Sequence, residues 1–85
     1  MKLTISEHVQ KQIKKISKPY QIIVGNRIRR LTGQFVLGEE KLQGYKNYYR
    51  VRAGVYRIIF MKYASEIEIV LIGHRKEIYL LLKNF

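Results

Sequence analysis

Three arginines, Arg50, Arg52 and Arg57, stand on a segment in which apolar and cationic residues alternate. The alternation has the period of a β-strand, breaks at Gly54 and then resumes, which predicts a hairpin that holds the arginines on its strands. A rigid group of positive charges beside aromatic rings suits a bound polyanion, because guanidinium groups neutralise phosphates and rings stack on bases. The hairpin therefore indicates a site for RNA or DNA.

Further residues of the same chemical character lie on either side of this hairpin. They are Lys41, His74, Arg75, Tyr79 and Lys83. Such a set suits cleavage of RNA by its own 2′-hydroxyl, because arginines can clamp the phosphate and stabilise the charge of the phosphorane. The tyrosine can stack on a base or relay a proton. We expect Lys41, His74 and Lys83 to contact the RNA.

The general base of this reaction stays open. Arginine keeps its proton in proteins, so the hairpin arginines are better suited to bind phosphate and acidify the 2′-hydroxyl. His74 has the right intrinsic pKa for acid–base work, but a surface histidine at a strand end is an equal alternative. The arginines could also cover a solvated sheet face, paired with Glu66 and Glu68, and Tyr79 could simply pack the C-terminal segment.

The composition is strongly basic. The chain has 85 residues and a net charge of +11, with 17 Lys and Arg against 6 acidic residues, all of them glutamate. This charge predicts attraction to nucleic acid or to an acidic protein. A membrane partner is not expected, because the cations follow strand patterns and no apolar run is long enough to span a bilayer.

The absence of cysteine excludes a disulfide framework, a thiol nucleophile and a Cys-type zinc site. With two histidines, no aspartate and no ligand spacing between acidic residues and histidines, we expect neither a metal nor another cofactor. We expect a single domain over residues 1–85 and a cytoplasmic location.

Hydrophobic spacing predicts two helices in the first half of the chain. After a strand at Lys2–Ile5, Ser6 can cap a helix that Pro19 ends. A second helix is expected from about Tyr20 to Phe35. Its expected apolar side comprises Ile23, Val24, Ile28, Leu31 and Phe35. Its expected solvated face carries Arg27, Arg29 and Arg30.

The second half is expected to form most of a sheet. The strands are predicted at about Tyr48–Ala53, Val55–Lys62 and Glu66–Ile72, and the last becomes continuously apolar, as a central strand would. Glu77–Phe85 is helical by composition. The pattern predicts an α+β fold, with two N-terminal helices packed on a four-stranded, mainly antiparallel twisted sheet and a short C-terminal helix. The arginines would cover the face opposite the two helices.

Three motifs in the second half resemble the RelE/ParE superfamily of type II toxin–antitoxin toxins, and the RelE branch in particular. The motifs are Lys41-Leu42-Gln43-Gly44, Tyr49-Arg50-Val51-Arg52-Ala53-Gly54-Val55-Tyr56-Arg57-Ile58-Ile59-Phe60 and Gly73-His74-Arg75-Lys76-Glu77-Ile78-Tyr79. The resemblance implies a RelE-like fold and a metal-independent mRNA interferase that cuts mRNA in the ribosomal A site. It also implies a cognate acidic antitoxin, in a complex that is a heterotetramer or larger.

The resemblance also assigns roles to individual residues. The implied catalytic set is Arg50, Arg52, Arg57, Arg75 and Tyr79. Arg50 and Arg52 fall where RelE toxins often carry lysines, one of them proposed as the general base, and Arg57 falls at a phosphate-stabilising arginine. Lys41 falls at a basic substrate contact. The ParE branch, which targets DNA gyrase, usually lacks this set, so the set favours the RelE branch. The alternative functions are a gyrase inhibitor of the ParE type and a non-catalytic RNA-binding module.

Overall fold

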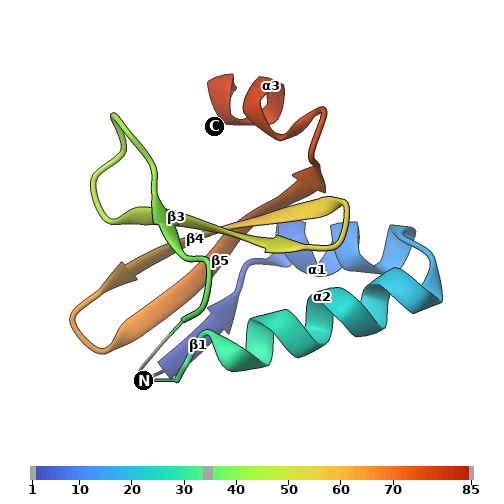
Figure 1. Cartoon of the computed structure of the whole chain (residues 1–85), viewed down its shortest axis with the longest axis horizontal. Coiled ribbons are helices and arrows are strands. Elements are labelled where there is room, and N and C mark those ends of the chain that lie inside the picture. Colours follow the sequence, from blue (N-terminus) through green and yellow to red (C-terminus); the bar gives the residue numbers. More distant parts are fainter. Residues whose placement is uncertain (1, 34–35, 85) are drawn as a thin grey trace.

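A five-stranded sheet separates two N-terminal helices from a short C-terminal helix (Figure 1). The computed structural model describes residues 2–33 and 36–84. The strands are β1 (Lys2–Ile5), β2 (Glu40–Lys41), β3 (Tyr48–Ala53), β4 (Tyr56–Tyr63) and β5 (Glu66–His74). Their order is β1-β5-β4-β3-β2, with only the β1–β5 pair parallel. The α+β prediction is confirmed, but its count of four strands missed the two-residue β2.

The N-terminal elements form largely as their sequence predicts. The hydroxyl of Ser6 accepts a hydrogen bond from the Val9 N–H, 3.2 Å away, and so caps α1 (Glu7–Lys15). Pro19 does not end this helix but lies in the first turn of α2 (Lys18–Arg30), where a missing N–H costs nothing. The second helix therefore begins and ends earlier than expected, and Phe35 lies outside the described residues.

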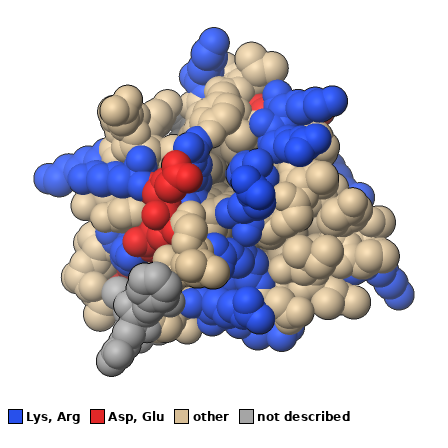
Figure 2. Space-filling model, in the orientation of Figure 1, with Lys and Arg blue, Asp and Glu red and all other residues tan. Residues whose placement is uncertain are grey.

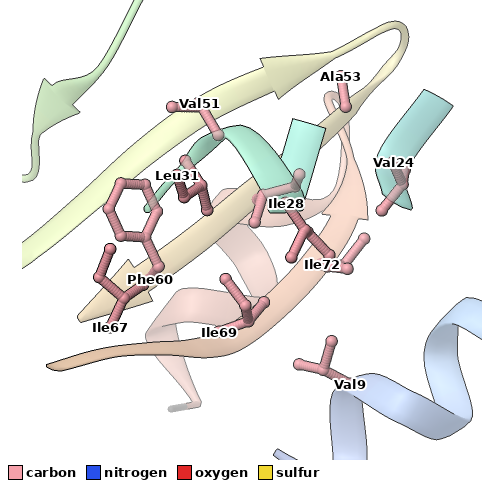
Figure 3. Packing of buried hydrophobic residues seen from close by; sticks show 11 residues of the cluster. Val9, Val24, Ile28, Leu31, Val51, Ala53, Phe60, Ile67, Ile69 and Ile72 are labelled. Carbon is pink, nitrogen blue, oxygen red and sulfur yellow. The ribbon is translucent and has the colours of Figure 1, made fainter. Parts of the chain in front are cut away.

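Both helices pack on one face of the sheet. Val9, Val24 and Ile28 meet side chains of β3, β4 and β5 in a core from which water is excluded (Figure 3). Ile23 was expected on the same stripe, but its side chain is 42% exposed. It stands ~100° around the helix from Val24 and so lies at the margin of the buried stripe, near Gly54 in the β3–β4 turn.

The opposite face of the sheet is covered at one end by α3 (Ile78–Lys83). Ile78 and Leu82 are buried there as expected, whereas Leu81 remains partly exposed. A bulge in the β4–β5 pairing leaves Val70 without a partner, so Val70 and Leu71 both project toward α3. The remaining apolar side chains of β5 enter the first core, which confirms β5 as a central strand buried on both faces.

None of the helices in the described part of the chain is long and apolar enough to cross a membrane.

Two glycines give a direct test of this packing. A Cβ at Gly73 would lie 2.9 Å from Leu81 Cδ1 and 3.0 Å from Cδ1 of the fully buried Ile78. We therefore expect Gly73→Ala to lower the free energy of unfolding by about 1–3 kcal/mol, as overpacking does. Gly25→Ala, in the open middle of α2, is expected to raise it by roughly 0.5–1 kcal/mol. Urea midpoints that move in the same direction for both variants would contradict this packing.

Candidate functional site

The hairpin arginines gather on the sheet face that α1 and α2 leave uncovered. On β3, Arg50 and Arg52 alternate with residues whose side chains enter the first core. On β4, Arg57 is directly opposite Arg52 in the antiparallel register, and its neighbours Tyr56 and Ile58 also point to that core. The alternation read from the sequence thus places all three guanidinium groups on one face.

This face is hollowed into a cleft of about 460 Å³, which we call the arginine cleft. Its lining comprises Arg27, Leu37, Gly38, Glu40, Arg50, Val51, Arg52, Arg57 and Tyr79. A second hollow, the lysine groove, meets it at Glu40, Arg50 and Tyr79. The lysine groove is also lined by Lys41, Leu42, Gln43, Tyr45, Leu82 and Lys83. Figure 2 shows basic side chains gathered around the middle of this side of the molecule, next to a small acidic patch.

The arginines in and beside the cleft are crowded and poorly neutralised. Among the described residues, Arg52, Arg57 and Arg75 have no carboxylate within ion-pair distance. Burial and the nearby charges of Arg52, Arg75 and Arg50 lower the pKa of Arg57 from its ordinary value. Like charges held together on a rigid sheet repel one another, and a bound phosphate relieves that repulsion. The chemistry of the cleft is therefore suited to an anion.

One carboxylate stands in this basic cleft. Glu40 Oε2 lies 2.7 Å from Nη2 of Arg50, and this hydrogen bond together with the Arg50 charge lowers the pKa of Glu40. No other acidic residue lines either hollow within the described ranges. The alternative in which the hairpin arginines pair with Glu66 and Glu68 is wrong, since neither glutamate forms an ion pair in the part of the chain that is described.

Tyr79 borders both hollows from the first turn of α3. The Cζ of Arg50 lies 5.6 Å from the centre of its ring, a cation–π distance, and the side chain is 48% exposed. The neighbouring Ile78 is buried and anchors this turn to the sheet. The ring can therefore present a face to a ligand that enters the cleft, while Lys41 and Lys83 extend the positive surface along the lysine groove.

His74 and Arg75 occupy different places from the rest of the predicted set. The His74 ring packs edge-on against Tyr56, with centroids 6.1 Å apart, on the side of the sheet that faces α2, and it lines neither hollow. Arg75 follows β5, where its N–H donates to the carbonyl of Val55. It is exposed and is not part of the lining of the cleft, but it lies close enough to Arg57 to affect the pKa of that residue.

Two charged residues of the cleft were not predicted from the sequence. Arg27 was expected on the solvated face of its helix, but it is half-buried and reaches the cleft from α2. Glu40 was not assigned a role, although Glu39 and Glu40 are the only acids in a basic stretch before the hairpin. That interruption is the one signal in the sequence that could have identified Glu40.

Comparisons with known proteins agree with the fold and the motifs. The family model described as "ParE toxin of type II toxin-antitoxin system, parDE" matches residues 3–79. The chain therefore belongs to this family of the RelE/ParE superfamily, and it is a RelE-like toxin of a type II toxin–antitoxin system. A search of curated proteins found no match.

Three solved structures are similar over most of their length. The RelE of the RelB-RelE antitoxin-toxin complex from Methanococcus jannaschii is 26% identical, with a TM-score of 0.76, over 92% of this chain and 96% of that chain. The archaeal RelE-RelB complex from Pyrococcus horikoshii OT3 is 21% identical, with a TM-score of 0.67, over 87% and 93%. The isolated E. coli RelE toxin is 17% identical, with a TM-score of 0.70, over 98% and 95%. The last two similarities support the fold alone.

The lowered pKa of Glu40 makes a first prediction about the site. We expect carboxyl NMR titration to give a pKa below the ordinary glutamate value, and Arg50→Gln to raise it. Because the pKa is depressed in the folded state, the pair stabilises the fold above the pKa of the unfolded chain. That stabilisation is lost as the pH falls through the folded pKa. Equal Glu40 pKa values in the wild type and Arg50→Gln would show that the pair does not form in solution.

Proposed function

We propose that this toxin is a metal-independent endoribonuclease that cleaves mRNA in the ribosomal A site. The observation that carries the proposal is the arginine cleft, whose described lining joins four arginines to one carboxylate, which is paired with Arg50, and to one aromatic ring. Such a cleft offers the groups that cleavage by the 2′-hydroxyl needs: phosphate ligands, a base and a stacking surface. The similarity to RelE toxins supports the same assignment.

The scissile phosphate would bind to the hairpin arginines. Arg52 and Arg57 are directly opposite each other across β3 and β4, so their guanidinium groups can hold the two non-bridging oxygens. The negative charge of these oxygens grows in the phosphorane, and fixed cations stabilise it without reorganisation. Arg75, beside the cleft, would add to this field and contact the flanking RNA backbone.

Glu40 would serve as the general base. In the free protein its carboxylate is bound to Arg50, and a phosphate that binds Arg50 would displace it. The freed carboxylate can take the proton of the 2′-hydroxyl, whose oxygen then attacks phosphorus. The bond to the 5′-oxygen breaks, and this leaving group takes a proton from the Tyr79 hydroxyl or from water. The products are a 2′,3′-cyclic phosphate and a free 5′-hydroxyl end.

The RNA strand would run from the arginine cleft along the lysine groove. The two hollows share Arg50 and Tyr79, so a strand can pass from one to the other without leaving the basic surface. Tyr79 would stack on a base, and Lys41 and Lys83 would contact the phosphates beyond it. His74 faces the other side of the sheet, so we now assign it to packing against Tyr56 rather than to RNA binding.

We further propose that an acidic antitoxin neutralises this toxin in the cytoplasm, in a complex that is a heterotetramer or larger. The net charge of +11 favours an acidic partner, and Ile22, Leu37 and Leu80 are apolar side chains that remain more than 60% exposed. Two of the similar structures are complexes of RelE with RelB. The toxin itself would act as one domain over residues 1–85.

The activity can be tested by expression in cells. We expect induced wild-type toxin to stop growth and to create new 5′ ends within translated mRNA. Loss of one preorganised cation from such a site costs about 10²–10³ in rate, so Arg57→Ala should abolish both effects. A gyrase inhibitor, the alternative that the ParE name of the family model suggests, would instead leave mRNA intact and block supercoiling in the same lysate.

The role of Glu40 can be tested with an adjacent control. Glu40→Gln and Glu39→Gln change the net charge equally, but Glu39 pairs with Lys62, 2.6 Å away, and does not line the cleft. We expect Glu40→Gln to lower the cleavage rate on ribosomes by roughly 10²–10⁴-fold, as loss of a general base does. Glu39→Gln keeps an amide oxygen for Lys62 and should cleave at the wild-type rate. Equal rates in the two variants would remove Glu40 from the mechanism.

A further inference from the structure

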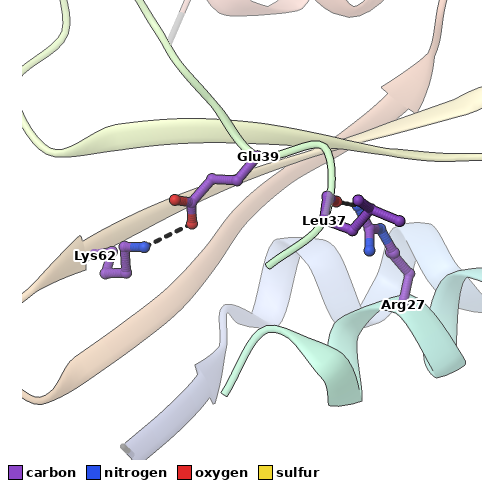
Figure 4. A network of polar contacts seen from close by, with 4 residues as sticks. All are labelled: Arg27, Leu37, Glu39 and Lys62. Atoms are coloured by element: carbon purple, nitrogen blue, oxygen red, sulfur yellow. Dashed lines mark hydrogen bonds and ion pairs between the residues drawn. The ribbon is translucent and has the colours of Figure 1, made fainter. Parts of the chain in front are cut away.

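Arg27 joins three parts of the protein through one guanidinium group. Its Nε donates to the carbonyl oxygen of Arg52, 3.1 Å away. Its Nη2 donates to the carbonyl oxygen of Leu37 (Figure 4). Arg27 stands on α2, Arg52 on β3 and Leu37 on the segment that leads to β2. The contact therefore connects the helix layer, the sheet and the loop beside the cleft.

The contact with β3 fills a gap at the edge of the sheet. The short β2 pairs only with Tyr49 and Arg50, so within residues 2–33 and 36–84 no strand accompanies the outer edge of β3 at Arg52. A carbonyl at a bare edge needs another donor, and Arg27 supplies it. The position of the Arg52 backbone, and with it the start of the Arg52 side chain, is thereby fixed from α2.

The loop is shaped around the same guanidinium group. Gly38 adopts a φ of +76°, and a Cβ there would lie 3.4 Å from Nη2 of Arg27. Only two residues further along, the loop delivers the Glu40 carboxylate to Arg50. Glu39, between them, is held from the other face of the sheet by Lys62 (Figure 4). Lys62 thus anchors Glu39, the residue before the proposed base, and Arg27 anchors the preceding part of the loop at Leu37.

We propose that Arg27 is a positioning residue that sets the Glu40 carboxylate relative to Arg50 and Arg52. This inference deepens the proposed function and rests on it for the role of Glu40. Arg27 acts through the Leu37–Gly38 backbone and not by binding the phosphate. A planar fork can donate to two carbonyls at once in fixed directions, whereas the single ammonium group of lysine cannot reproduce that geometry.

The test uses a substitution that keeps the charge. In Arg27→Lys the positive potential of the cleft is retained, but the fork is lost. We expect the dissociation constant for a 2′-O-methyl RNA oligonucleotide, which cannot be cleaved, to stay at the wild-type value. Single-turnover cleavage on ribosomes should fall by about 10- to 100-fold, because a small displacement of a catalytic group has that effect. Arg29→Lys, on the exposed side of the same helix, should change neither quantity.

A second measurement does not depend on cleavage. If Arg27 positions Glu40, Arg27→Lys loosens the Glu40–Arg50 pair, and the NMR-measured pKa of Glu40 rises toward its ordinary value. Gly38→Ala disturbs the same loop from the opposite side of the guanidinium group and should raise this pKa as well, whereas Arg29→Lys should not. The Glu40 pKa can be measured even if the wild-type protein cleaves no RNA. Failure of the proposed function and failure of the positioning role can therefore be told apart.

Two results would overturn the positioning role. One is an unchanged Glu40 pKa in both Arg27→Lys and Gly38→Ala, when circular dichroism shows that both variants are folded. The other is a loss of affinity for the 2′-O-methyl oligonucleotide in Arg27→Lys that accounts for the whole loss of cleavage, since that would make Arg27 a direct phosphate ligand.

Discussion

The mutual repulsion of arginines on one sheet face is the constraint on which the rest of this structure depends. Arg50, Arg52, Arg57 and Arg75 lie close enough for three of them to lower the pKa of the fourth, and only Arg50 has an acidic partner among the described residues. Repulsion of this kind opposes folding and must be offset by packing elsewhere. A bound polyanion, as we propose for this cleft, would remove a cost that the free protein bears.

The fold supplies that offset while leaving the arginines accessible. Two helices bury one face of the sheet, and α3 covers only one end of the other, with a bulge at Val70 that adds an apolar side chain to this smaller core. The close approach of α3 to β5 over Gly73 puts Tyr79 at the edge of the arginine cleft. The smaller core thus stabilises the arginine-bearing face and, at the same time, places the aromatic ring of the candidate site.

Patterns within single strands were readable from the sequence, and contacts between elements were not. Alternation on β3 and β4 predicted which face carries the arginines, because side-chain direction follows strand period. His74 was expected to contact RNA, but β5 runs on through Gly73 to His74, and the histidine ring packs against Tyr56 on the face toward α2. The two-residue β2 has no pattern of its own. Arg27 reaches the cleft from α2, and Glu40 reaches it from a loop whose path depends on tertiary contacts, so their presence in one cleft could not be predicted from spacing.

The central claim is that the hairpin arginines form one phosphate site. The most direct measurement is an NMR titration of the arginine side-chain N–H signals with a short RNA oligonucleotide that carries 2′-O-methyl groups. If the claim holds, the signals of Arg50, Arg52 and Arg57 shift together and saturate at one RNA concentration, while the lysines of α1 are unaffected. Signals that saturate at separate concentrations, or a response spread evenly over all basic residues, would contradict it.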